Sequence, residues 1–469
     1  MLFNSIEYLI FLPIVFILYW LLNNNYKNQN ILLLISSYIF YGWWDYRFLS
    51  LIVFSSFLDY FVGMKIEEAI SENRKKRWLL VSLCSNLGLL GVFKYYNFFA
   101  DSFASSMSVL GWEVNDLTLN IILPVGISFY TFQTLSYSID IYRGQIKASR
   151  DIIGFFTFVS LFPQLVAGPI ERASNLIPQI ENKRKLDTNL IKTGIFQIFI
   201  GLLRKVAIAD NLGVYVDSVY ANYDIHNGST LLVATIFYAF QIYFDFSGYS
   251  DIAIGSAKLF GFNFNRNFNF PYFSKTLTEF WRRWHMSLSF WLRDYLYISL
   301  GGNRKGIIIT YRNLLLTMLI GGLWHGSSWN FVIWGGIHGL FLSFEKFTFS
   351  ALKIKTFNAF GYIYTFIIVL IAWIFFRAAD FSSASKIILE IFSFNYDSLF
   401  IGDINSFVNA LLLLSIGVLI DLKVFKSNVP LENYGTRYST LKLSVIVSVV
   451  IIMLCLFYSS TENFIYFQF

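Results

Sequence analysis

Long apolar runs are the feature that most limits what this chain can fold into. The stretches "YLIFLPIVFILYWLL" (8–22), "YIYTFIIVLIAWIFF" (362–376) and "LKLSVIVSVVIIMLCLFY" (441–458) approach the roughly 20 residues that cross about 30 Å of hydrocarbon as a helix. Several other runs are shorter or are interrupted by Gly and Pro. Because backbone polar groups must be paired inside a bilayer, we expect an all-α polytopic membrane protein with about 11 to 13 membrane-entering segments.

The composition argues against a soluble protein. Of the 469 residues, 56% are hydrophobic and 14% are charged, whereas a soluble domain has roughly 25% charged residues. The net charge of +7 comes from basic residues between the apolar runs, a pattern that orients membrane proteins. Cys84 and Cys455 lie inside apolar runs, so neither a disulfide framework nor a cysteine metal site is indicated. We expect contact with membrane lipid, no nucleic-acid partner and no metal.

Basic clusters predict the orientation of the chain. The strongest cluster near the N-terminal spans is "NRKKRW" (73–78), so we place the loop from Lys65 to Arg77 in the cytoplasm. Counting back through two spans puts Lys27 in the cytoplasm, and the span before it puts the N-terminus outside. Residues 101–120 carry acidic but no basic side chains, as expected of an external loop.

The apolar stretch at residues 152–170 is expected to enter the membrane and return. The segments on either side, "IYRGQIKASR" (141–150) and "NKRK" (182–185), are both basic, so both should be cytoplasmic. The stretch also contains Pro163 and the pair Gly168-Pro169. Irregular backbone at membrane depth is tolerated only where it is packed in protein or lines a cavity.

Residues 245–300 combine charged and aromatic side chains. A charge at the bilayer centre costs about 2.5–3.5 kcal/mol on insertion scales, so this density predicts a protein-lined interior or interface. The charged residues are Asp245, Asp251, Arg266, Arg282, Arg283, Arg293 and Asp294.

The segment at 279–306 is expected to form one amphipathic helix that ends at Gly301-Gly302, with Glu279 paired to Arg283. An interfacial belt is an equal alternative for its Arg and Trp residues. That alternative explains His285 less well.

Three of the four histidines, His285, His325 and His338, fall in the central part of the chain, where the apolar runs are broken. The fourth, His226, has the surroundings of a solvated loop. For His325, in "GGLWHGSSWN" (321–330), the alternative to a functional role is a packed core histidine whose nitrogens are satisfied by carbonyls. The neighbouring glycines favour function, because Gly326 and the pair Gly321-Gly322 would let a substrate approach the imidazole.

His338 follows His325 by thirteen residues, which on one straight helix is about 20 Å of rise and about 220° of rotation. The two could reach one substrate atom only if the helix broke at "GSS" (326–328), so we expect His338 to be structural and pair His325 with His285. The sequence has no H-E-x-x-H, Walker or G-x-S-x-G motif. Intramembrane carboxylates could serve a proton path, so transport stays an alternative.

In its motifs and their order, the chain resembles the bacterial membrane-bound O-acyltransferase (MBOAT) family, in its alginate O-acetylase and peptidoglycan O-acetyltransferase branch. The resemblance covers nearly the whole chain. The motifs are "LPVGISFYTFQTLSYSIDIYRG" (123–144), "FPQLVAGPIER" (162–172), "FDFSGYSDIAIG" (244–255), "NFNFPYFSKTLTEFWRRWHMSLSFWLRDYLYISLGGNR" (267–304), "GGLWHGSSWNFVIWGGIHG" (321–339) and "WIFFRA" (373–378).

The resemblance implies a fold and a site. The family's essential histidine lies in a Trp-His-Gly motif, here Trp324-His325-Gly326, and its second histidine in an Arg-Trp-His-Met motif, here Arg283-Trp284-His285-Met286. The implied fold is a ring of tilted helices around a thin centre, with a funnel and a tunnel meeting near the histidines. We expect one membrane domain, 1–469, with a catalytic core at about 120–345 and peripheral C-terminal helices at about 380–469.

We expect His325 to be a general base for an acceptor hydroxyl, a role worth about 10²–10⁴ in rate. His285 would orient the acyl group or stabilise developing charge, with Trp284 closing the pocket. The expected substrate-binding set is Trp324, Trp284, Arg283 and Asn330.

The branch implies transfer of an acyl group, in the first place acetyl, from a cytoplasmic thioester donor such as acetyl-CoA. The acceptor would be an extracytoplasmic polysaccharide, an alginate-like exopolysaccharide or peptidoglycan, reached through an exported acetyltransferase partner. The setting would be the bacterial cytoplasmic (inner) membrane, with no bound cofactor.

Three alternatives stay open. D-alanyl transfer to teichoic acid is the first, because that branch shares both histidine motifs. Glycerolipid acylation is disfavoured, because Asn330 stands where an aspartate is usual. The third is a transporter or flippase without chemistry, in which Asp245, Asp251 and Arg283 would bind substrate or protons.

Overall fold

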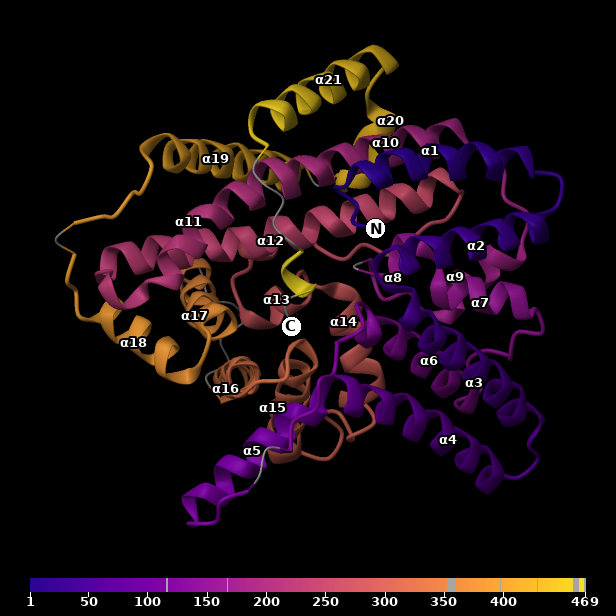
Figure 1. Ribbon diagram of the computed structural model, residues 1–469, viewed down its shortest axis with the longest axis horizontal. Helices are drawn as coiled ribbons and strands as arrows, with labels where there is room; N and C mark the ends of the chain where they lie inside the picture. The colour runs from indigo at the N-terminus through magenta and orange to yellow at the C-terminus, as the bar shows by residue number, and fades with distance from the viewer. Residues whose placement is uncertain are drawn as a thin grey trace. The chain divides into compact units, whose positions relative to one another are not determined.

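The computed structural model describes residues 1–114, 117–166, 168–351, 359–396, 398–427, 429–458 and 464–467. Over these residues the chain is helical and contains no β-strand (Figure 1). Its contacts divide it into two compact units. Unit 1 is Met1–Asp187 with Phe260–Phe264, and unit 2 is Thr188–Leu259 with Asn265–Phe469.

Six helical stretches of the described chain are long and apolar enough to cross a membrane: Tyr26–Glu68, Glu72–Val109, Gly228–Leu259, Ile307–His325, Phe360–Arg377 and Ile404–Ser427. Three shorter apolar helices, Ile6–Leu21, Ile152–Leu165 and Thr440–Leu456, accompany them. The expectation of an all-α polytopic membrane protein is confirmed. The six stretches are fewer than the predicted membrane-entering segments, partly because Tyr26–Glu68 joins two successive helices and partly because broken segments are too short.

The helices of unit 1 are α1 (Ile6–Leu21), α2 (Tyr26–Asp45), α3 (Leu49–Glu68), α4 (Glu72–Leu90), α5 (Tyr96–Val109), α6 (Ile127–Tyr142), α7 (Ile152–Ser160), α8 (Phe162–Leu165) and α9 (Ala173–Glu181). A buried carboxylate joins three of them. Asp59 of α3 accepts hydrogen bonds from Ser82 and Asn86 of α4 and from Ser138 of α6, at 2.5 to 2.6 Å. Such interhelical hydrogen bonds hold helices together where lipid offers no hydrophobic driving force.

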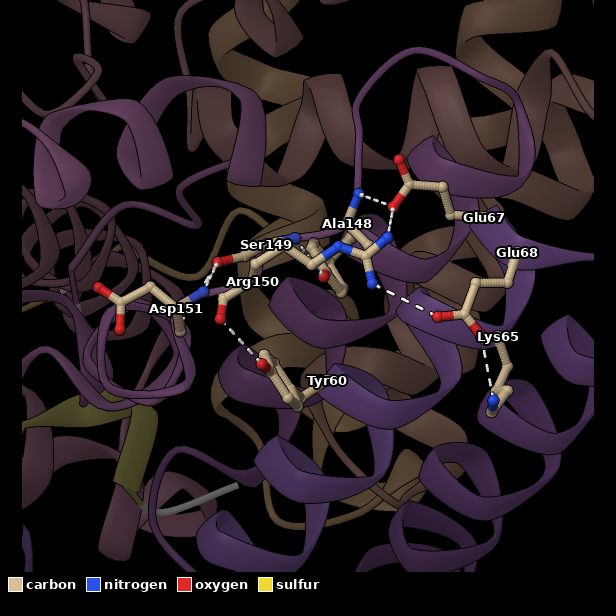
Figure 2. A network of polar contacts seen from close by, with 9 residues as sticks. Tyr60, Lys65, Glu67, Glu68, Ala148, Ser149, Arg150 and Asp151 are labelled. Atoms are coloured by element: carbon tan, nitrogen blue, oxygen red, sulfur yellow. Dashed lines mark hydrogen bonds and ion pairs between the residues drawn. The ribbon is translucent and has the colours of Figure 1, made fainter.

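Two segments that the charge pattern assigns to the cytoplasm lie together in unit 1 (Figure 2). Arg150 donates to Glu67 at 3.0 Å and to Glu68 at 3.5 Å, at the C-terminal end of α3. Glu67 also accepts from the backbone N–H of Ala148, and Tyr60 donates to the carbonyl of Arg150. The two segments are therefore at one end of the unit, as a shared side of the membrane requires.

The stretch at 152–170 has the form that a re-entrant segment needs. Its helix α7 has nine residues, or about 13 Å at 1.5 Å per residue, which is less than half of the hydrocarbon thickness. The residues that flank the stretch are close, because the hydroxyl of Ser149 donates to Glu181 at 2.7 Å. Both flanks therefore lie at the same end of the unit.

The helices of unit 2 are α10 (Thr188–Leu202), α11 (Asp210–Ala221), α12 (Gly228–Leu259), α13 (Leu277–Trp281), α14 (Met286–Trp291), α15 (Ile307–His325), α16 (Trp329–Ala351), α17 (Phe360–Arg377), α18 (Phe381–Phe392), α19 (Ile404–Ser427), α20 (Tyr434–Arg437) and α21 (Thr440–Leu456). Short π-helical segments at Leu203–Ala209 and Leu292–Tyr297 and 3₁₀ turns, of which Ile465–Phe467 is the last, complete the unit.

Helix α12 is almost entirely buried and packs closely on α10 through glycines. A Cβ on Gly194 would lie 2.7 Å from the carbonyl oxygen of Gly255, and one on Gly201 would lie 2.6 Å from that of Gly248. The two glycine pairs bring the backbones together in antiparallel order. Small residues at such crossings are typical of helix packing in membranes.

Helices α15 and α16 show that two sequence-based interpretations were wrong. The chain does break at Gly326-Ser327-Ser328, so His325 and His338 do not share a straight helix. The space left by Gly326 is filled by the ring of Phe331, which a Cβ there would overlap. Gly322 likewise faces the carbonyl of Phe331. These glycines permit close packing of the two helices rather than the approach of a substrate.

The expected single helix at 279–306 is also wrong. Helix α13 ends at Trp281, His285 takes a left-handed conformation with φ 40° and ψ 57°, and α14 begins at Met286. The periodicity of the segment is compatible with one helix, but it carries no information about this break. The predicted pair of Glu279 and Arg283 is confirmed at 2.8 Å.

Candidate active site

Unit 2 brings the two motif histidines together. His285 lies between α13 and α14, and His325 is the last residue of α15. Their ring centroids are 6.5 Å apart, and the two residues are 0% and 3% exposed. An acyl group bound between them would be shielded from water, which favours transfer over hydrolysis.

Asn267 fixes the ring of His285. The Oδ1 atom of Asn267 lies 3.1 Å from Nδ1 of His285 and accepts from the backbone N–H of Ser287 at 3.3 Å. Because a backbone N–H can only donate, this oxygen is an acceptor, and Nδ1 of His285 must carry a proton. A neutral imidazole protonated at Nδ1 has its lone pair on Nε2. His285 thus offers an acceptor nitrogen to the site.

The backbone of His285 is strained. A left-handed conformation costs a residue other than glycine about 1–3 kcal/mol and persists only where the surroundings impose it. Here the carbonyl of Asn267 accepts from the N–H of Met286 at 2.8 Å, directly after the strained residue. Strain of this kind clusters at active sites.

His325 lies at a helix terminus that bears partial charge. It ends a 19-residue helix, after which Gly326 continues in an extended conformation. The carbonyl end of a helix carries partial negative charge and stabilises a cation there by about 0.3–1 kcal/mol, and by up to about 2 kcal/mol in partly buried sites. This terminus would therefore stabilise a proton that His325 takes from a hydroxyl group.

Aromatic rings surround His325. The ring centroids of Trp324, Trp334 and Phe376 lie 5.1, 4.9 and 5.4 Å from it. Trp324 also lies 6.0 Å from the ring of His285. Of the expected substrate-binding residues, Trp324 is therefore beside both histidines.

The other expected substrate-binding residues have contacts elsewhere. Trp284 is buried among Phe280, Phe268 and Trp373, at centroid distances of 5.6, 5.2 and 5.0 Å. Arg283 donates to Glu279 and to the carbonyl of Asn269. Asn330 donates to the carbonyl of Ala378, which ties the start of α16 to the end of α17.

Tyr466 is a site residue that the sequence reasoning missed. Its ring centroid lies 5.5 Å from that of His325 and 6.3 Å from that of His285. The residue belongs to the last described segment, Phe464–Phe467. We expected the region from about 380 onward to be peripheral, and the only signal against this was the concentration of aromatic residues in "FIYFQF" (464–469).

His338 is buried behind the site. Its Nδ1 accepts from the indole of Trp281 at 3.3 Å, and the ring of Trp334 lies 4.8 Å from it. The same indole ring lies 4.9 Å from His325, so Trp334 stands between the two histidines. This packing supports the structural role predicted for His338.

Two buried ion clusters lie next to the site. Arg204 and Lys205 are consecutive residues on the π-helical segment after α10, and they reach different carboxylates of α12. Arg204 pairs with Asp251 at 2.6 Å and with Asp421 of α19 at 2.5 Å. Lys205 pairs with Asp245 and with Asp210, both at 2.7 Å. These intramembrane charges form ion pairs with one another, as buried charges must.

Two cavities adjoin this framework. One of about 280 Å³ is lined mainly by aromatic side chains, among them Tyr243 and Tyr272, with Asp421 in its wall. The other, about 20 Å³, is polar and is lined by Arg266, Ser250 and Asn267 among others. Within the described ranges, no three His, Cys, Asp or Glu side chains gather as a metal site would require.

Comparison with known proteins agrees with this geometry. The model of the MBOAT, membrane-bound O-acyltransferase family, matches residues 146–385. A probable alginate O-acetylase of Pseudomonas putida is 45% identical over 396 residues, which cover 84% of this chain and 81% of that protein. A peptidoglycan O-acetyltransferase of Helicobacter pylori is 38% identical over 426 residues, covering 83% of this chain and 79% of that protein.

A more distant relative covers less of the chain. The teichoic acid D-alanyltransferase of Bacillus subtilis is 29% identical over 241 residues, which cover 49% of this chain and 60% of that protein. Because the family model includes both histidines and the first two relatives cover most of the chain, the protein belongs to the membrane-bound O-acyltransferase family and is a multi-pass membrane enzyme that transfers acyl groups.

Proposed function

We propose that this enzyme transfers an acetyl group from a cytoplasmic thioester donor, such as acetyl-CoA, for O-acetylation of an extracytoplasmic polysaccharide. The observation that carries the proposal is the buried pair of His285 and His325, whose rings lie 6.5 Å apart in a chain of the acyltransferase family. The names of the relatives that match most of the chain, an alginate O-acetylase and a peptidoglycan O-acetyltransferase, support acetyl as the group and a polysaccharide as the final acceptor.

In the proposed reaction, His325 takes the proton of an acceptor hydroxyl as its oxygen attacks the thioester carbonyl. The helix terminus at His325 stabilises the resulting imidazolium. The carbon–sulfur bond then breaks, and the proton passes from His325 to the leaving thiolate. Overall, an ester and a free thiol form from a hydroxyl and a thioester.

His285 has a different part in this proposal. Its Nδ1 proton is held by Asn267, so its neutral ring presents the lone pair of Nε2. Such a nitrogen accepts a hydrogen bond and can orient the acceptor hydroxyl toward the donor. This assignment favours orientation over the stabilisation of negative charge, which would need a donating nitrogen.

The donor and acceptor must be handled from opposite sides of the membrane. We propose that the acetyl group leaves to an exported acetyltransferase partner, which modifies the polysaccharide outside the cytoplasmic membrane. The N-terminus would then lie outside, as the basic loops near residues 73–78 and 141–150 predict.

The experiment that tests the proposal compares ester-linked acetate in the envelope and secreted polysaccharide of a deletion strain. The strain is complemented with wild type, His325→Ala or His285→Ala, at equal membrane levels. We expect wild type alone to restore full acetylation, with a loss of about 10²–10⁴-fold for His325→Ala. Full restoration by His325→Ala would contradict the assignment and favour transport, whereas D-alanine esters in place of acetate would favour the teichoic-acid alternative.

A further inference from the structure

The last described segment of the chain is fixed to the site by a buried charge. The backbone N–H of Ile465 donates to Oδ2 of Asp245 at 2.8 Å. The other carboxylate oxygen of Asp245 lies 2.7 Å from Nζ of Lys205, and this ammonium group also lies 2.7 Å from Asp210. The charged side chains are at most 2% exposed, so the interaction is sheltered from water.

The residues on either side of Ile465 pack on α12. The ring of Phe464 lies 4.2 Å from that of Tyr249, and the ring of Tyr466 lies 4.3 Å from that of Phe246. Phe246 and Asp245 are consecutive residues of α12. One short stretch of this helix therefore holds both the backbone and a ring of the segment.

The same contacts set the position of Tyr466 in the site. Its ring lies within 6.3 Å of both histidine rings and 6.3 Å from the ring of Phe376. Phe246 itself lies 4.6 Å from the ring of His285. A shift of the segment would thus change the wall of the site beside both histidines.

The charge of the cluster explains why Asp245 is suited to hold a backbone amide. Lys205 supplies one positive charge for two buried carboxylates, so each carboxylate needs further hydrogen bonds to offset the loss of water. The amide of Ile465 provides one to Asp245. A hydrogen bond to a charged group is stronger than one between neutral groups, and a bond to the backbone does not depend on the side chain at position 465.

We propose that Asp245, held by Lys205, is a positioning residue for acyl transfer, which anchors the C-terminal segment through the amide of Ile465 and keeps Tyr466 beside the two histidines. This inference rests on the proposed function, because it takes the histidines to be the reacting site. It gives a role to intramembrane charges that would otherwise suggest a proton path.

The anchor is tested first without any chemistry, by amide hydrogen exchange of the purified full chain, read by mass spectrometry on the peptide that contains Ile465. Removal of a hydrogen bond to a charged group corresponds to about 10- to 100-fold, so Asp245→Ala should exchange faster by that factor. Asp245→Asn keeps an oxygen that can accept from Ile465 and leaves Lys205 paired with Asp210, so exchange should stay within about threefold of wild type. Unchanged exchange in Asp245→Ala would overturn the proposal.

The link to the reaction is tested by a double-mutant cycle. Ile465→Pro removes the N–H, and proline is tolerated at the first position of a helical turn, which Ile465 occupies. Asp245→Ala and Ile465→Pro should each lower kcat for acetyl transfer at least about tenfold, with the KM of the donor and the thermal midpoint little changed. The double variant should be no slower than the slower single variant.

Losses that multiply in the double variant would overturn the positioning role, because the two residues would then act independently. Loss of folded protein in Asp245→Ala with normal kinetics in Ile465→Pro would likewise reduce Asp245 to a core ion pair. If wild type transfers no acetyl group, the proposed function fails, while faster exchange in Asp245→Ala would still establish the anchor.

Discussion

The side-chain amide of Asn267 holds His285 from one side and reaches Ser250 of α12 from the other. Its Oδ1 lies 3.1 Å from Nδ1 of His285, and its Nδ2 donates to the hydroxyl of Ser250 at 3.0 Å. Asn267 thereby fixes the orientation of the imidazole relative to α12, which is almost entirely buried. The ring of Phe246, on the same helix, lies 4.6 Å from that of His285 and packs against the imidazole.

Replacement of Asn267 should therefore act on catalysis through His285. Asn267→Leu keeps a similar volume but loses the acceptor, so we expect acetyl transfer to fall by about 10- to 100-fold, the loss typical of a buried hydrogen bond to a functional group. The measurement is the initial rate of acetyl transfer at equal amounts of folded protein.

The matched variant is Asn267→Asp, which still offers an oxygen to Nδ1 of His285 and to Ser287. Its rate should exceed that of Asn267→Leu by at least about threefold, since the ring remains held. A wild-type rate in Asn267→Leu would show that His285 does not need this contact.

The sequence predicted much of the fold because a bilayer allows few kinds of backbone structure. Apolar runs specify helices, and the basic flanks of residues 152–170 indicated a segment whose ends the Ser149–Glu181 hydrogen bond brings together. The histidine pair followed from motif spacing and resemblance. These features depend on local composition, which a single sequence contains.

What the sequence could not provide depends on contacts between distant residues. The break at His285 is imposed by surroundings such as Asn267, and the local periodicity gives no sign of it. Tyr466 reaches the site because the neighbouring amide of Ile465 is bonded to Asp245, and the sequence marks it only by the aromatic residues around it. Gly322 and Gly326 were assigned to the approach of a substrate, because the sequence does not show that Phe331 fills the space beside them.

Gly326 should be required for the packing of α16 beside the end of α15. A Cβ there would overlap the ring of Phe331, so Gly326→Ala should cost about 1–3 kcal/mol of stability and lower the thermal midpoint in detergent. The control is Gly336→Ala on α16, whose Cβ would lie 3.6 Å from Leu319, an ordinary contact. Equal midpoints for the two variants would contradict the packing role and revive the idea of a substrate passage at Gly326.

The orientation of the chain is testable with cysteines. Cys84 and Cys455 are exposed, so both are first replaced by serine. In spheroplasts, a membrane-impermeant thiol reagent should label Thr118→Cys, in the acidic loop, and spare Glu72→Cys, next to the basic cluster. The reverse pattern would place the N-terminus in the cytoplasm and overturn the assignment of both basic segments.

Two arginines, each bridging two carboxylates, allow burial to be separated from pairing. Arg204 binds Asp251 and Asp421 with its side chain 7% exposed, whereas Arg150 binds Glu67 and Glu68 with its side chain 58% exposed (Figure 2). Removal of Arg204 leaves two buried carboxylates without their cation, which costs about 3–5 kcal/mol. Arg204→Leu should therefore fold poorly, with a large loss of membrane-inserted protein.

Arg150→Leu should behave differently, because exposed ion pairs contribute about 0–1 kcal/mol and water replaces the lost partner. Membrane level and thermal midpoint should stay near wild type, even though the same number of ion pairs is lost. A partial recovery of Arg204→Leu by the added change Asp251→Asn would identify the unpaired charge as the cause, since the amide removes one buried carboxylate. No recovery, together with equal effects at both arginines, would show that their packed side chains rather than their charges carry the stability.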